Sequence, residues 1–132
     1  MRLIQIVILS TVLALLATPG FGADPPKFYK DTFPEHALQY KLEAEMALVG
    51  ENAQLDVKTR ELIALGVSAQ IPCEYCVYAH TKNAIAAGAS EAEIREAVAT
   101  AAHVRHWSTV LNGMAYDLES FKMEVDEMHD PK

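Results

Sequence analysis

Prolines, glycines and capping residues divide residues 34–128 into segments of helical length, and this spacing limits the fold to a set of short helices. Pro34 suits a first helical turn after a Thr32 cap, Gly50 suits the end of that helix, and Asp56 suits the cap of the next one. Within each segment the apolar residues recur at helical spacing, and no run alternates with a period of two. The pattern predicts an all-α domain of four to six helices.

A proline and a capping pattern set the later boundaries. The second helix must end before Pro72, because a proline disfavours helical conformation for the residue that precedes it. A third helix is expected to start at or just after Pro72 and to run to about Ala87, with Gly88 as its C-terminal cap. Residues 90–93 form a capping-box pattern that opens a fourth helix, and a further helix is expected over about 114–128.

The first residues have the layout of a secretory signal peptide. A short positive start precedes an apolar stretch over 3–17, and small residues at 22 and 23 suit a cleavage site. The stretch is short for a membrane span of about 20 residues. We therefore predict cleavage of 1–23 and export, to a bacterial periplasm, with no stable membrane association afterwards. Residues 24–33 are expected to form an extended lead-in, and 129–132 a tail.

Charge and size restrict the partners of the chain. It carries 11 Lys and Arg against 18 Asp and Glu, a net charge of −7, whereas binding to nucleic acid needs a basic surface. A single domain in a chain of 132 residues buries only about two-thirds of its unfolded surface. Nine alanines lie within 84–102, and small side chains bury little apolar area each. We therefore expect a homo-oligomer.

The residues that carry chemistry lie in and just before the third predicted helix. On a helix, Cys73, Cys76 and His80 stand at i, i+3 and i+7 and share one face. The two cysteines are then close enough for a disulfide, and His80 is within reach of Cys76 as a proton acceptor. Glu61, on the preceding helix, is placed to orient the imidazole and stabilise its charge. Tyr75 points about a quarter-turn away.

This set of residues suits redox chemistry at sulfur. A thiol reacts as its thiolate, and a free cysteine with a pKa of about 8.5 is mostly protonated at neutral pH. The first turns of a helix favour negative charge, and an imidazole can take the proton. Oxidation of one thiolate to a sulfenic acid, followed by attack from the other sulfur, yields a disulfide. The sequence therefore predicts a dithiol–disulfide cycle.

Other uses of the same residues stay open. The cysteine pair could be a purely structural disulfide, although so short a loop constrains little chain. The residues Cys73, Cys76, His80 and Glu61 could instead bind zinc. Either alternative would make the protein a non-enzymatic helical oligomer. Attachment of c-type haem is rejected because Val77, not histidine, follows the second cysteine, and a thioredoxin-like fold would need strands.

The spacing Glu61, eleven residues, Cys73-x-x-Cys76-x-x-x-His80 resembles the signature of the carboxymuconolactone decarboxylase family, in its alkylhydroperoxidase D-like branch. The resemblance spans roughly residues 35–115. It implies a helical fold that assembles as trimers or hexamers and a peroxidase that uses no cofactor or metal. Its substrates would be hydrogen peroxide or organic peroxides, and an unidentified thiol or dithiol would reduce it.

The resemblance also implies a role for each residue. Cys76 would attack the peroxide, Cys73 would resolve the product, and His80 with Glu61 would relay protons. In the best-known members a histidine directly precedes the second cysteine, and Tyr75 stands there in this chain. The decarboxylase branch generally lacks the cysteine pair, which disfavours the alternative of a carboxymuconolactone decarboxylase-like lyase.

A second polar cluster lies on the fourth predicted helix. His103 and His106 stand at i and i+3, beside Arg105 and Trp107. Two histidines at this spacing can bind a metal, but a structural or interface role is the better expectation. Arg105 is a candidate for binding a substrate carboxylate or for forming a surface ion pair.

Overall fold

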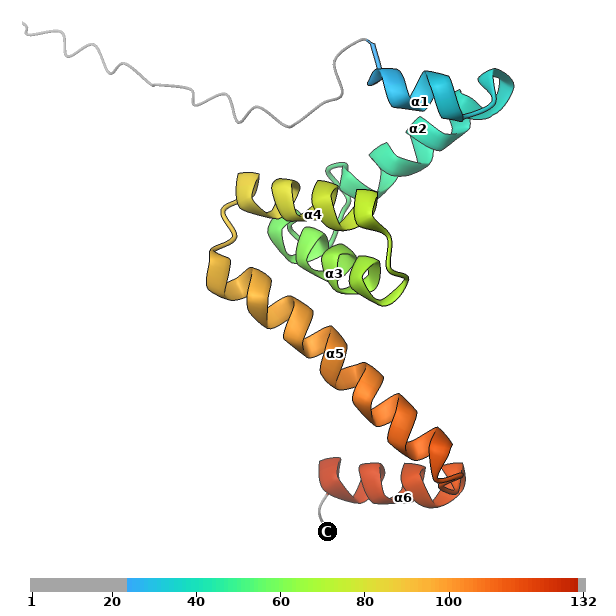
Figure 1. Ribbon diagram of the computed structural model, residues 1–132, viewed down its shortest axis with the longest axis vertical. Coiled ribbons are helices and arrows are strands. Elements are labelled where there is room, and N and C mark those ends of the chain that lie inside the picture. The colour runs from blue at the N-terminus through green and yellow to red at the C-terminus, as the bar shows by residue number, and fades with distance from the viewer. Residues whose placement is uncertain (1–23, 131–132) are drawn as a thin grey trace, which may run out of the picture. The chain divides into compact units, whose positions relative to one another are not determined.

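The computed structural model describes residues 24–130, and every regular element in that range is a helix (Figure 1). In chain order the helices are α1 (Lys27–Thr32), α2 (Glu35–Val49), α3 (Val57–Gln70), α4 (Glu74–Ala86), α5 (Glu91–Gly113) and α6 (Leu118–His129). The predicted all-α class, with four to six helices, is confirmed. The predicted signal peptide, 1–23, lies outside the described residues. None of the helices in the described range has both the length and the apolar character needed to cross a membrane.

The first compact unit ends at Met46 and contains α1 and most of α2. The Tyr29 hydroxyl donates a hydrogen bond to the Glu45 carboxylate at 2.7 Å and so ties α1 to α2. Lys41 forms an ion pair with the same carboxylate. Partial burial, together with the Glu45 charge and hydrogen bond, raises the pKa of Tyr29 to about 12.

Two predictions for the start of this unit are wrong. Residues 24–33 are not simply extended, because Lys27–Thr32 form a helix directly after Pro26, whose fixed φ suits a helix start. Thr32 does not cap the following helix, since its hydroxyl donates to a carbonyl within α1 at 2.6 Å. Instead α2 begins immediately after Pro34.

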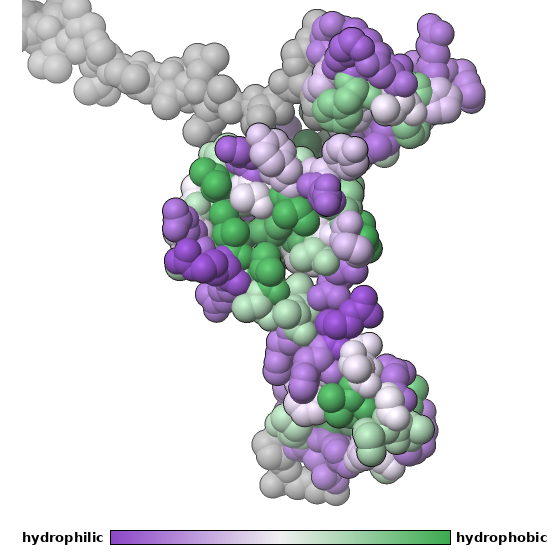
Figure 2. All heavy atoms as spheres, in the orientation of Figure 1, coloured by the Kyte–Doolittle hydropathy of each residue, from purple (hydrophilic) through white to green (hydrophobic). Residues whose placement is uncertain are grey.

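In the second unit, α3 packs against both α4 and α5. The buried residues of the described chain are Leu65, Ser68, Ala84 and Ala89. Many large apolar side chains stay exposed, and Figure 2 shows hydrophobic residues gathered on the visible surface over α3 and α4. The three packed helices therefore enclose only a small core.

The predicted caps are present in this unit. The Asp56 side chain accepts from the Thr59 amide at 2.9 Å at the start of α3. Ser90 and Glu93 form both halves of the capping box at the start of α5. Gly88 follows α4 with a φ of +88°, a left-handed conformation that glycine adopts without steric cost. These contacts explain why the helix boundaries follow the sequence signals closely.

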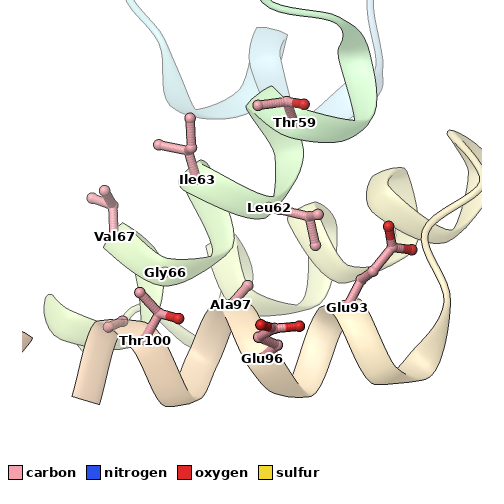
Figure 3. A pocket seen from close by; sticks show the side chains of 10 residues that line it. Thr59, Leu62, Ile63, Gly66, Val67, Glu93, Glu96, Ala97 and Thr100 are labelled. Carbon is pink, nitrogen blue, oxygen red and sulfur yellow. The ribbon is translucent and has the colours of Figure 1, made fainter. Parts of the chain in front are cut away.

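A groove of about 410 Å³ runs between α3 and α5 (Figure 3). The two helices approach closely at Gly66, where an added Cβ atom would lie 3.5 Å from the Ala101 Cβ, an ordinary van der Waals distance. Lys58 bridges the two helices with an ion pair to Glu93 at 2.7 Å. Near the start of α5, the contact with α3 thus includes the Lys58–Glu93 ion pair.

Candidate active site

The cysteine pair lies where the α3–α4 connection turns into α4. Cys73 is the N-cap of α4, with φ −95° and ψ 100°, so it stands just before the helix and not within it as predicted. Its amide donates to the Ser68 carbonyl at 3.1 Å, and its sulfur accepts the Cys76 amide at 3.2 Å. The two cysteines form a disulfide, and their Cα atoms are 5.3 Å apart.

A carboxylate and an imidazole from neighbouring helices meet one turn along α4 from Cys76. His80, one turn after Cys76 on α4, places its Nδ1 2.7 Å from Glu61 Oε2 on α3. The Glu61 side chain is 13% exposed and that of His80 is 33% exposed. The contact that the spacing predicted between these two residues is therefore present.

The contact fixes which nitrogen of the imidazole is available. An ionised carboxylate can only accept hydrogen bonds, so Nδ1 carries the hydrogen that it donates to Glu61. The Nε2 atom of a neutral His80 then keeps its lone pair and can accept a proton.

Ser68 is a residue of the site that the sequence did not single out. It lies seven residues after Glu61 on α3, and it is only 3% exposed. Its hydroxyl donates to the Ala64 carbonyl at 2.6 Å, and its own carbonyl accepts the hydrogen bond from the Cys73 amide. The i, i+7 spacing from Glu61 placed it on the same helix face, but serine alone carries no signal for such a role.

The other candidates lie apart from these contacts. Tyr75 is 90% exposed. The Trp107 indole donates to His103 Nε2 at 3.0 Å, and the His103 and His106 rings stack with centroids 6.4 Å apart. Among residues 24–130, no three His, Cys, Asp or Glu side chains are grouped so that they could hold a metal ion.

Arg105 on α5 contacts Gln70 at the end of α3. Its Nε donates to the side-chain oxygen of Gln70 at 2.9 Å, and among residues 24–130 it forms no ion pair. Gln70 in turn donates to the Ala101 carbonyl at 2.7 Å. These bonds tie the end of α3, just before the cysteines, to α5.

Comparison with known proteins identifies the family. The model of the carboxymuconolactone decarboxylase family matches residues 36–118, which include the whole site. The chain therefore belongs to this family, whose members include both alkylhydroperoxidase D-like proteins and decarboxylases.

Two curated relatives are similar over part of their length. An uncharacterized protein of Haemophilus influenzae (strain ATCC 51907 / DSM 11121 / KW20 / Rd) is 49% identical over 60 residues, 42% of this chain and 53% of the relative. The "uncharacterized protein 4 in cox locus" of Paracoccus denitrificans is 36% identical over 58 residues, 44% of this chain and 52% of the relative. The matched part of the chain thus spans about half the length of these relatives.

Proposed function

We propose that the protein is a thiol-dependent peroxidase, or a disulfide oxidoreductase working by the same dithiol–disulfide cycle. The observation that carries this proposal is the Cys73–Cys76 bond at the start of α4, with the Glu61–His80 pair on the adjoining turn. The family match supports it at a coarser level, because the family contains peroxidases of this type.

The first half of the cycle oxidises Cys76. In the reduced protein, His80 Nε2 takes the proton of the Cys76 thiol. The thiolate attacks the terminal oxygen of the peroxide, the O–O bond breaks, and the alkoxide or hydroxide that leaves takes the proton from His80. Cys76 is left as a sulfenic acid, two electrons more oxidised, and one alcohol or water has formed.

The second half forms the disulfide. The Cys73 thiolate attacks the Cys76 sulfur, the S–O bond breaks, and hydroxide leaves to become water. The product is the bonded state that the structure describes. A thiol or dithiol reductant must then return two electrons to restore the two thiols.

A rapid-mixing experiment tests this function. Reduced full-length protein is mixed with hydrogen peroxide or an alkyl hydroperoxide, and peroxide loss is followed by stopped flow. We expect Cys76→Ser to abolish the reaction. Cys73→Ser should consume one equivalent of peroxide and stop at the sulfenic acid. Equal rates for wild type and Cys76→Ser would refute the proposal.

Assembly and export are further parts of the proposal. Exposed apolar side chains on α5 and the turn after it support a homotrimer or homohexamer, since Val104 is 64% exposed, Trp107 50% and Met114 76%. Light scattering of the purified protein tests this, and a monomer would contradict it.

Export of the protein is proposed from residues 1–23, and sequencing the N-terminus of the mature protein tests it. A mature protein that begins after residue 22 or 23 would support export, and one retaining Met1 would contradict it.

Two other functions have direct assays. A structural or zinc-bound cysteine pair would show as thiols that stay unreactive toward peroxide, or as one zinc per chain in metal analysis of the purified protein. A lyase would release carbon dioxide from small carboxylated lactones. We expect none of these outcomes.

A further inference from the structure

The two sulfurs of the disulfide stand in different surroundings. The Cys73 sulfur occupies the N-cap position of the 13-residue α4 and accepts the Cys76 amide hydrogen at 3.2 Å. It therefore takes the place that a serine or aspartate oxygen fills at other helix starts, where the helix dipole favours negative charge. The Cys76 sulfur belongs to the residue one turn before His80.

These surroundings stabilise different chemical species. A hydrogen bond from an amide to a thiolate, at the positive end of a helix, lowers the pKa of the thiol. The backbone places the Cys76 amide against the Cys73 sulfur, so negative charge that develops on this sulfur meets a hydrogen-bond donor. Cys76 instead has the Glu61–His80 pair on the next turn, which moves protons.

The leaving group decides how a disulfide opens. When a thiolate attacks one sulfur of a disulfide, the other sulfur leaves, and the thiol of lower pKa leaves faster. Both cysteine residues are half-buried, so their exposure does not by itself select which sulfur is attacked. The cap of α4 thus favours Cys73 as the sulfur that departs.

Resting on the proposed dithiol–disulfide cycle, we propose that the reductant attacks Cys76 and that Cys73 is the leaving thiolate stabilised by the N-cap of α4. In this step a thiolate R–S⁻ bonds to the Cys76 sulfur, the Cys73–Cys76 bond breaks, and its electron pair stays on Cys73. A second thiolate of the reductant then attacks the R sulfur and displaces Cys76. The reductant becomes a disulfide, and the protein gains two electrons.

In this cycle the peroxide, Cys73 and the reductant all react at the Cys76 sulfur. Cys73 enters as a thiolate when the sulfenic acid on Cys76 is resolved, and it leaves as a thiolate when the disulfide is opened. The peroxide and the reductant therefore need access to the same sulfur.

Trapping the mixed disulfide tests the assignment without any peroxide. Oxidised full-length protein is mixed with limiting 2-mercaptoethanol, quenched in acid within seconds, and the free thiols are then alkylated. Both cysteines fall in one tryptic peptide, residues 61–82, so fragmentation within that peptide must locate the two labels. We expect mercaptoethanol on Cys76 and the alkyl group on Cys73 in roughly fivefold excess or more over the reverse pattern. The reverse pattern, or an even mixture, would overturn the proposal.

Single-cysteine variants provide an independent measurement. Cys76→Ser keeps the backbone amide that donates to the Cys73 sulfur, and Cys73→Ser keeps a good helix cap, so both should fold. Thiolate absorbance near 240 nm, followed against pH, should show Cys73 ionising at a lower pH than Cys76. The opposite order would contradict the assignment. Because neither assay contains peroxide, failure of the peroxidase proposal would leave these results standing, and the converse also holds.

Discussion

The hydrogen bond between Glu61 and His80 supports the sharpest prediction about activity. Glu61→Gln keeps the shape of the side chain and can still accept from Nδ1, but it removes the negative charge beside the imidazole. A hydrogen bond to a charged group contributes about 1.5–3 kcal/mol and a neutral one about 0.5–1.5 kcal/mol, and the Glu61 side chain is only 13% exposed, so solvent screens its charge little. Because glutamine keeps the bond and loses only the charge, about 1–1.5 kcal/mol is lost in the transition state, and the rate falls about 5-fold to 13-fold.

The assay is peroxide consumption by the reduced protein, compared at the same thiol concentration for wild type and variant. Glu127→Gln on α6 is the matched control, because it makes the same chemical change on an exposed residue far along the chain. The control should keep the wild-type rate. Disulfide formation by a chemical oxidant should also be unchanged in Glu61→Gln. A Glu61→Gln rate within twofold of wild type would refute a role for the carboxylate.

Three further predictions concern stability. The hydrogen bond from Lys58 lowers the pKa of Glu93 from 4.5 to about 2, so the ionised group stabilises the fold fully above pH 4.5 and the contribution disappears as pH falls toward 2. The difference in unfolding free energy between wild type and Glu93→Gln should shrink over that interval in denaturant titrations; a difference independent of pH would contradict the linkage. Gly66→Ala should raise stability by about 1 kcal/mol, because the new methyl group meets Ala101 at 3.5 Å, an ordinary contact, and alanine favours helix. Ala115→Gly should also raise the melting temperature, because glycine adopts the left-handed φ of +48° without the strain of about 1 kcal/mol that alanine carries there. A lower melting temperature in either variant would contradict its prediction.

Much of the fold could be predicted because its boundaries depend on local chemistry. Asp56, Ser90 and Gly88 act within one turn of their own position, and they stand where the sequence placed them. Thr32 failed as a cap because its hydroxyl bonds to its own helix, an alternative that serine and threonine always carry. Helix α1 was missed because six residues after two prolines carry too little periodicity to distinguish a helix from an extended segment.

Helical spacing predicted which residues of the candidate site lie close together, but not the backbone conformation at Cys73. The i, i+4 and i, i+7 offsets placed His80 near the cysteines, and the short connection to α3 brought Glu61 beside it. The position of Cys73 was displaced by one residue, from the first turn to the N-cap, because the backbone after Pro72 stays extended. That single residue changes its role, since only the cap position lets its sulfur accept the Cys76 amide. Ser68 contacts Cys73 through its backbone carbonyl, so its side-chain type carried no signal for this contact.

The ratio of thiols lost to peroxide consumed distinguishes a dithiol peroxidase from a structural cysteine pair. Reduced wild-type protein is given a known, limiting amount of hydrogen peroxide, and free thiols and remaining peroxide are measured together. The proposed cycle predicts that two thiols disappear for each peroxide consumed, and that mapping finds them joined as Cys73–Cys76. If peroxide persists while both thiols stay free, the cysteine pair is not a peroxidase centre.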